Sequence, residues 1–396
     1  MNSSTSSSDR VYLKILLAIM LGMGAAMGIV HVFFWANDAS AETILSRVME
    51  SRSVLPRIVA LEEPVIMVFG SSMVQAGYSP RQFDAEMAEQ GVKLKSFNFG
   101  FGGLNPFFQD YFSRRIREEF DDGDKRLQLA IIEFNPFQIT QARWNGAVST
   151  VDSFLTMLAS DQEIWEIALD DPERGALLFN IRYLRNDISA EMATSFFASP
   201  LRAPRERSKL PQDEEMQALR DELGAKLNQK FEEEYPDFDG KPWNWGWQGG
   251  GTIPQERSAE TLDIVNQYYA AGKMDYRLDS DRINRVNCCD ILDMNFEPLL
   301  VESFIRIVEN FKQFSEQVEI IMLPLNTDWI EYTPQGRKRL DAVISEIEQA
   351  TGVTIRNFQN IDGLSNEMFS DTTHLNRYQG AVRFTHHLVD QFGDDL

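Results

Sequence analysis

An acidic residue and a histidine stand three positions apart near the C-terminal end of the chain, in the stretch Asp371-Thr-Thr-His374. The chain has only four histidines, and this one lies in a polar segment that is typical of a loop. A serine hydrolase needs an imidazole as general base and a carboxylate that holds the ring in one tautomer. One loop of this kind supplies both groups, so we expect His374 and Asp371 to act on a serine.

The candidate nucleophile is Ser72, at the end of the stretch Phe69-Gly70-Ser71-Ser72. This stretch follows the apolar run 64–69, and Gly70 is expected to permit a tight turn that exposes the serine. An acyl-transfer intermediate carries an oxyanion, and one well-placed N–H donor is worth about 3–4 kcal/mol to it. The sequence offers two such donors after apolar runs, the backbone of Gly103 and the side chain of Asn135.

The elements that must position these residues alternate between strand and helix. Strands are predicted at 64–69, 92–97, 127–134, 318–325 and 353–358, and helices at 80–91, 105–120, 299–314, 334–352 and 379–392. Such alternation predicts an α/β fold with a central parallel sheet of about five strands and helices on both faces. Ligands bind at the carboxyl ends of parallel strands. All five candidate residues follow predicted strands, so we expect them to meet at one edge.

The domain organisation follows from where this alternation starts, breaks and resumes. We predict a cytoplasmic tail at 1–10, a transmembrane anchor or signal peptide at 11–36, and a stalk helix at 37–60. The α/β domain is predicted in two parts, 61–139 and 297–396. Between them, 140–296 is predicted to be a large insertion, helical and irregular.

The N-terminal apolar run bears on localisation. Ile15–Trp35 contains no Asp, Glu, Lys or Arg and is long enough to cross a bilayer as a helix. Arg10 and Lys14 precede it, which favours a single-pass protein of the inner membrane with its body on the periplasmic or extracytoplasmic side. The sequence Ala39-Ser40-Ala41 suits a signal-peptidase site, so a cleaved signal peptide is the alternative.

Charge and cysteine content narrow the ligands and partners. The net charge of -22 argues against nucleic acid, which binds basic surfaces. The two cysteines, Cys288 and Cys289, are adjacent and form no zinc-binding pattern. No metal and no organic cofactor are expected.

In this pattern the chain resembles the SGNH (GDSL-like) hydrolase superfamily. The resemblance rests on four blocks in the family's order: Gly70-Ser71-Ser72, Asn98-x-Gly100-x-x-Gly103, Glu133-Phe-Asn135-Pro136 and Asp371-x-x-His374. It implies a three-layer α/β/α, flavodoxin-like fold, a Ser72-His374-Asp371 triad, and an oxyanion hole formed by Gly103 and Asn135.

Two blocks depart from the family's usual residues. Ser71 stands where Asp is usual, and Glu133 and Pro136 stand where Gly and Asp are usual. These departures look like the membrane-anchored branch that includes the teichoic acid D-alanyl transfer protein and the alginate O-acetylation proteins. That branch works beside a membrane-bound O-acyltransferase.

The resemblance implies an exported, membrane-anchored serine acyltransferase or esterase, which moves acyl groups, with acetyl expected, onto or off a cell-envelope polysaccharide. The departures also motivate a second hypothesis, a non-catalytic scaffold that partners the acyltransferase or an export machine. A lipase or thioesterase is the third.

Overall fold

The computed structural model of the chain describes residues 7–36, 46–148, 151–180, 182, 214–234, 258–274, 277–376, 379–393 and 396. By its internal contacts the chain divides into two compact units. One unit combines Met1–Thr43 with Ser149–Arg205, and the other combines Ile44–Val148 with Glu206–Leu396. The segment predicted as one insertion is therefore shared between the two units.

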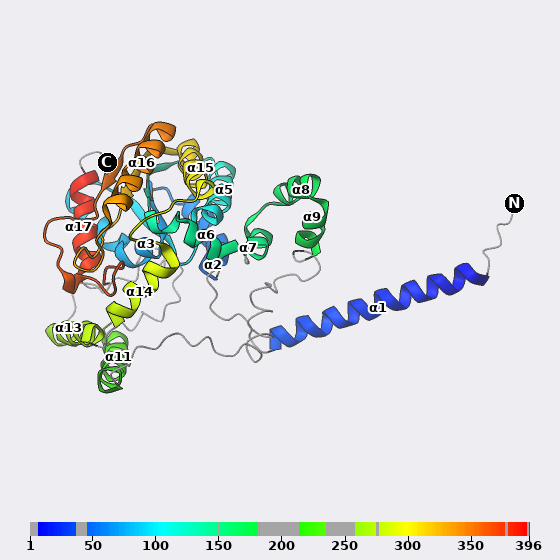
Figure 1. Cartoon of the computed structure of the whole chain (residues 1–396), viewed down its shortest axis with the longest axis horizontal. Coiled ribbons are helices and arrows are strands. Elements are labelled where there is room, and N and C mark those ends of the chain that lie inside the picture. Colours follow the sequence, from blue (N-terminus) through cyan, green and yellow to red (C-terminus); the bar gives the residue numbers. More distant parts are fainter. Residues whose placement is uncertain are drawn as a thin grey trace. The chain divides into compact units, whose positions relative to one another are not determined.

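A five-stranded, all-parallel sheet forms the centre of the larger unit (Figure 1). Its strands are β1 (Val65–Ser71), β2 (Lys95–Phe101), β3 (Leu127–Glu133), β4 (Ser315–Met322) and β5 (Ile355–Asn357). Their order is β2-β1-β3-β4-β5, and the predicted α/β class with a parallel sheet of about five strands is confirmed. The strand order changes direction between β1 and β3, which places the switch point of the sheet there.

Side chains of β1 pack on both faces of the sheet. All seven residues of this strand are buried, which accounts for its nearly unbroken apolar sequence. Ile66 and Val68 belong to the core on one face. Phe69 points to the other face, where its ring centroid lies 6.2 Å from that of Phe112 and 5.0 Å from that of Phe311. The strand is thus fixed on both sides just before the candidate nucleophile.

Helices cover both faces and make three layers. One layer contains α3 (Ser72–Gly77), α4 (Pro80–Glu89) and α17 (Gly380–Phe392), which pack together. The other contains α2 (Ser46–Val59), α5 (Pro106–Asp122), α15 (Pro298–Phe314) and α16 (Pro334–Thr351). The predicted ends of α16 are confirmed, because the Thr333 side chain caps its first turn and Gly352 follows its last residue with φ of 66°.

The second strand lies further along the chain than predicted. The expected strand was 92–97, whereas β2 runs from Lys95 to Phe101 and includes Gly100, which lies beyond the predicted strand. A Cβ at Gly100 would lie 2.2 Å from the backbone nitrogen of Gln75 in α3. Glycine is therefore required here by the close approach of another backbone, a use of glycine inside strands that a turn prediction overlooks.

The segment 140–296 is helical where it is described. Its helices are α6 (Gln141–Ala147), α7 (Val151–Leu158), α8 (Asp161–Asp170), α9 (Pro172–Phe179), α11 (Glu214–Glu234), α13 (Ala259–Met274) and α14 (Arg277–Cys289). Residues 183–213 and 235–257 lie outside the described part. The two ends of the segment lie side by side, since Thr140 and Phe296 form an antiparallel bridge. The chain therefore enters and leaves this segment at neighbouring points.

At the N-terminal end, α1 (Ser7–Ala36) covers the predicted anchor as one helix. Over the part of the chain that the structure describes, no helix is both long enough and apolar enough to cross a membrane. The membrane span predicted over 11–36 is therefore not found there. Residues 1–6 and 37–45 fall outside the described part, so of the predicted stalk the structure describes 46–60.

Candidate active site

Polar residues lie together where β1 and β3 end. β1 ends at Ser71, and Ser72 begins α3 directly afterwards. β3 ends at Glu133, and Asn135 caps the short 3-10 helix η1 (Pro136–Gln138). These two strands flank the switch point, so their carboxyl ends border the crevice in which open α/β sheets bind ligands.

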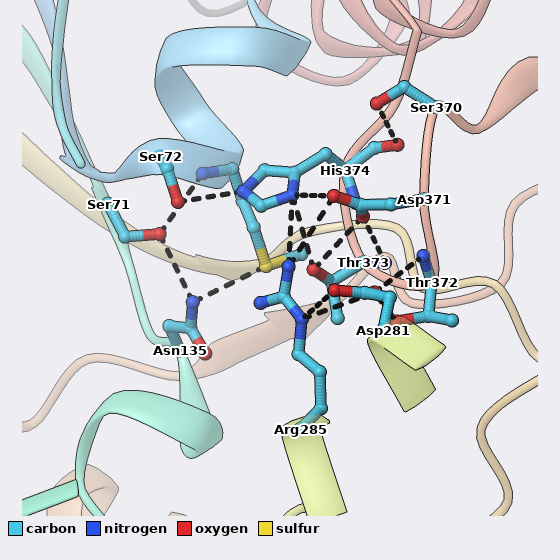
Figure 2. Close-up of polar contacts among 11 residues, drawn as sticks. Ser71, Ser72, Asn135, Asp281, Arg285, Ser370, Asp371, Thr372, Thr373 and His374 are labelled. Atoms are coloured by element: carbon cyan, nitrogen blue, oxygen red, sulfur yellow. Dashed lines mark hydrogen bonds and ion pairs between the residues drawn. The ribbon is translucent and has the colours of Figure 1, made fainter. Parts of the chain in front are cut away.

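The three predicted triad residues form one chain of contacts (Figure 2). His374 Nε2 lies 2.7 Å from Ser72 Oγ, and His374 Nδ1 lies 2.7 Å from Asp371 Oδ2. When Nδ1–H donates to the carboxylate, the lone pair on Nε2 faces the hydroxyl of Ser72, which is the tautomer that a general base requires. The side chains of His374 and Asp371 are 17% and 18% exposed, and Ser72 is also partly exposed. The geometry predicted for these residues is present.

Asp371 is held by its own loop and stays ionised. Its Oδ1 accepts hydrogen bonds from the backbone N–H of His374 at 2.7 Å and of Thr373 at 2.8 Å. Burial alone would raise the pKa of Asp371, but the hydrogen bond and charge of His374 and the charge of Arg285 together lower this pKa well below its ordinary value. A carboxylate held in this way can stabilise an imidazolium beside it.

Glu133 lies behind the nucleophile turn and binds Ser71 through both carboxylate oxygens. Oε2 accepts from the Ser71 backbone N–H at 2.5 Å, and Oε1 accepts from Ser71 Oγ at 3.0 Å. Glu133 is 4% exposed and Ser71 is 1% exposed. Burial raises the pKa of Glu133 to about 7, although the hydrogen bonds from Ser71 act in the opposite direction. Ser71 and Glu133, two of the three residues that depart from the resembled family's pattern, therefore contact each other.

Asn135, the predicted side-chain donor, points its amide toward the same turn. Its Oδ1 accepts from the Phe137 N–H at 3.0 Å, which leaves Nδ2 to lie 3.1 Å from Ser71 Oγ and 3.3 Å from Met73 Sδ. A thioether sulfur is a weak acceptor. The N–H on the Met73 side can therefore be redirected to a stronger acceptor, such as an oxyanion, at little cost.

The glycine segment after β2 lies against the nucleophile. A Cβ on Gly102 would lie 3.7 Å from Ser72 Cβ. The predicted donor, Gly103, is the next residue and has φ of 80°, a conformation that favours glycine. Its carbonyl oxygen accepts from Arg143 Nη2 at 3.0 Å. Gly103 is thus one residue from a direct neighbour of Ser72, and its role as an oxyanion donor stays a prediction.

Gly70 is needed for a different reason from the one expected. It lies in β1, and it is not among the described glycines with positive φ, so the expectation that it provides a turn is wrong. A Cβ at this position would lie 2.3 Å from Glu133 Oε2 and 2.7 Å from Val74 Cγ2. The residue must be glycine because the Glu133 carboxylate occupies the space beside it.

Two further residues at the site come from α14, and the sequence did not identify them. Arg285 Nη2 lies 3.4 Å from Asp371 Oδ2, and Asp281 Oδ2 accepts from the Thr372 N–H at 3.2 Å. The only local signal is their spacing, since Asp281 and Arg285 form an i,i+4 ion pair of 3.2 Å. Such pairs are common on solvated helix faces, so this signal does not predict a functional site.

The residues around Ser72 thus offer a nucleophile, a base, a carboxylate and hydrogen-bond donors. Among the described residues, no group of three or more His, Cys, Asp or Glu side chains is arranged to hold a metal ion. Comparison with models of known protein families and with curated proteins finds no match to this chain. A functional assignment therefore depends on the geometry around Ser72 and on the residue pattern that resembles SGNH hydrolases.

Proposed function

We propose that this chain is a serine esterase or O-acyltransferase in which Ser72 is the nucleophile. The observation that carries the proposal is the contact series from Ser72 through His374 to Asp371, with 2.7 Å at each step. Ser72 begins α3, and the other two residues lie about 300 positions further along, in the loop after β5, yet their atoms meet in the order that nucleophilic catalysis requires. Ser72 is also partly exposed, as a substrate would need.

In the proposed first half-reaction, Ser72 Oγ attacks the carbonyl carbon of an ester and passes its proton to His374 Nε2. The ionised Asp371 stabilises the imidazolium that forms. Asn135 Nδ2 and the Gly103 N–H are the proposed donors to the oxyanion. The intermediate collapses when the alcohol leaves with the proton from His374, and the acyl group remains on Ser72.

In the second half-reaction, an acceptor hydroxyl gives its proton to His374 and attacks the acyl carbon on Ser72. The bond between that carbon and Ser72 Oγ then breaks, and His374 returns the proton to Oγ. If the acceptor is water, the result is hydrolysis, and if it is a sugar hydroxyl, the result is transfer. The balance between them depends on how well the site excludes water once the substrate is bound. Both outcomes use the same residues in the same roles.

The substrate class and location are proposed from the resemblance. The strand order β2-β1-β3-β4-β5 is the flavodoxin-like order, which is compatible with an SGNH-like domain. On this basis we propose that the chain acts outside the cytoplasm on acyl groups, expected to be acetyl, of a cell-envelope polysaccharide. A membrane-bound O-acyltransferase is the proposed partner and acyl source.

A fluorophosphonate probe tests the central proposal, because it reacts with activated serines. We expect the full chain to be labelled on the peptide that contains Ser72, and labelling to be lost in Ser72→Ala and His374→Ala. Ser345→Ala is a suitable control, since Ser345 lies exposed on α16 and its hydroxyl donates to the Asp341 carbonyl of the same helix. This variant should be labelled like the wild type.

The opposite result also has a clear meaning. A well-folded wild type that is not labelled would overturn the proposed chemistry and favour the non-catalytic scaffold. A labelled enzyme that hydrolyses aryl acyl esters faster as the acyl chain lengthens would favour a lipase or thioesterase over a polysaccharide acetyl transfer enzyme.

A further inference from the structure

Helix α14 (Arg277–Cys289) contacts the loop that carries His374 and Asp371. It belongs to the segment predicted as an insertion, yet Asp281 and Arg285 on one of its faces meet residues 371–374. Figure 2 shows both side chains rising from α14 toward this loop. A separate segment therefore contacts both the candidate base and the carboxylate that orients it.

Asp281 fixes the backbone of the loop. Its Oδ2 accepts hydrogen bonds from both the N–H and the hydroxyl of Thr372, and the N–H contact measures 3.2 Å. Thr372 is fully buried and lies between Asp371 and His374 in sequence. A tilt of Thr372 would therefore move the carboxylate and the imidazole relative to Ser72.

Arg285 acts on the side chains of the loop. Its Nη2 lies 3.4 Å from Asp371 Oδ2, the oxygen that His374 Nδ1 contacts, and 3.4 Å from that Nδ1. A guanidinium only donates hydrogen bonds, so it binds the carboxylate and places a fixed positive charge beside the ring. Burial opposes that charge, but Asp281 and Asp371 outweigh it and raise the pKa of Arg285.

The far end of α14 is tied to the start of the same segment, just after η1. The Cys289 carbonyl accepts a hydrogen bond of 2.8 Å from Thr140 Oγ1, and Thr140 is fully buried. α14 also packs against α6 and α13. The helix is thus held at its Cys289 end. Asp281 and Arg285 are one helical turn apart on it, and both contact the loop 371–374.

We infer that Asp281 and Arg285 are positioning residues, through which α14 holds the Asp371–His374 loop in register with Ser72. This inference rests on the proposed function, since register matters only if His374 is the base. The insertion then has a role in the reaction itself, because the catalytic loop is held partly by the insertion as well as by its own turn. A displacement of about 1 Å at such a site costs on the order of 100-fold in rate.

The test compares Asp281→Asn, Arg285→Gln and the control Arg282→Gln, using aryl acetate turnover and hydrogen exchange of the peptide that contains 370–376. Arg282 lies exposed on the same helix. We expect Asp281→Asn to speed exchange in this peptide and to lower kcat about 10- to 100-fold with little change in KM. Arg282→Gln should match the wild type in both measurements.

Arg285→Gln has a second readout that a merely structural residue would not give. The charged groups that act on His374 are Asp371, Arg285 and, from the end of β3, Glu133. Removal of the cation takes away one of the charges that lower the pKa of Asp371, so the loss of kcat/KM on the acid side should begin at a higher pH. Wild-type kcat, exchange and pH profile in both α14 variants would overturn the inference.

The two proposals can fail separately. If the wild type shows no labelling and no turnover, the proposed function fails, whereas faster exchange of 370–376 in Asp281→Asn would still show that α14 holds the loop. If the wild type is active and both variants match it, only the positioning role is lost. A thermal unfolding measurement on each variant verifies that the whole chain remains folded.

Discussion

Two carboxyl groups reach the nucleophile turn from different parts of the sheet, and they are held in opposite ways. Asp371, in the loop after β5, contacts the ionisable groups of His374 and Arg285. Glu133, at the end of β3, accepts hydrogen bonds from the uncharged N–H and hydroxyl groups of Ser71. The first environment lowers the pKa of Asp371, and burial in the second raises the pKa of Glu133 to about 7.

These two environments suit Asp371 and Glu133 to different tasks. A carboxylate that stays charged beside an imidazole stabilises the positive charge that forms when the base takes a proton. A buried carboxyl with a raised pKa is poorly suited to that task, but it can fix geometry. Glu133 holds Ser71, and Ser71 Oγ in turn accepts from Asn135 Nδ2 at 3.1 Å. When their environments shift the pKa values of two acids in opposite directions, the two acids often have different roles in an active site.

The largest effect on turnover should come from removing the charge of Asp371. Asp371→Asn keeps the shape of the side chain but presents an amide, which favours the wrong tautomer of His374. We expect kcat for an aryl acetate to fall by about 10⁴-fold. The control is Asp362→Asn, an exposed acid in the same segment after β5, which should leave kcat unchanged. A loss of less than tenfold in Asp371→Asn would mean that Asp371 is not the orienting group.

An intermediate effect on turnover is expected for Asn135, the proposed oxyanion donor, which contacts Ser71 as Glu133 does. Asn135→Ala removes the Nδ2 donor, and kcat should fall by about 10²- to 10³-fold. The variant also loses a cap, because Asn135 Oδ1 accepts from the Phe137 N–H. Thr333→Ala provides a cap control, since Thr333 caps α16 through the Gly336 N–H.

Both cap variants should lose about 1 kcal/mol of stability, measured by urea unfolding, but only Asn135→Ala should lose activity. Equal kcat in the two variants would leave Asn135 as a helix cap with no part in catalysis. Glu133 would then have no proposed effect on the oxyanion through Ser71 and Asn135.

Much of the fold and the triad could be predicted from the sequence because the signals are local. Apolar runs of strand length, a proline after a capping threonine and a glycine at the end of α16 each depend on a few neighbouring residues. The Asp371 and His374 pair is also local, since one short loop carries both. Parallel strands then place their carboxyl ends at one edge, which brings Ser72 within 2.7 Å of His374 although the two are 302 residues apart.

The features that the sequence could not predict depend on contacts between distant segments. Arg285 meets Asp371 across 86 residues, and nothing in α14 indicates which of its faces will meet the catalytic loop. Ser71 and Glu133 were each noticed as departures, but only the alignment of β1 beside β3 shows that they are partners. The end of β2 at Phe101 could not be predicted for the same reason, because the glycine at position 100 is required by the backbone of Gln75.

The smallest effect on turnover is expected for Glu133→Gln. This variant should instead change how the stability of the protein depends on pH. The amide keeps the volume of the side chain and can still accept from the Ser71 N–H, so kcat should stay within about tenfold of the wild type. Stability should respond to pH. In the folded chain Glu133 holds its proton up to about pH 7, whereas its ordinary value is 4.5. Between these values the folded state binds the extra proton, so this residue's contribution falls as pH rises from about 4.5 to 7.

At about 1.4 kcal/mol per pH unit, that change amounts to at most about 3–4 kcal/mol. The wild type should therefore lose stability relative to Glu133→Gln over this window, as urea unfolding at pH 5 and pH 7 would measure. Asp371 has the opposite sign, because its contribution is present above its ordinary value of 3.8 and is lost as pH falls. If the wild type and Glu133→Gln gave parallel curves, Glu133 would be ionised throughout, and the two carboxyl groups would differ in position alone.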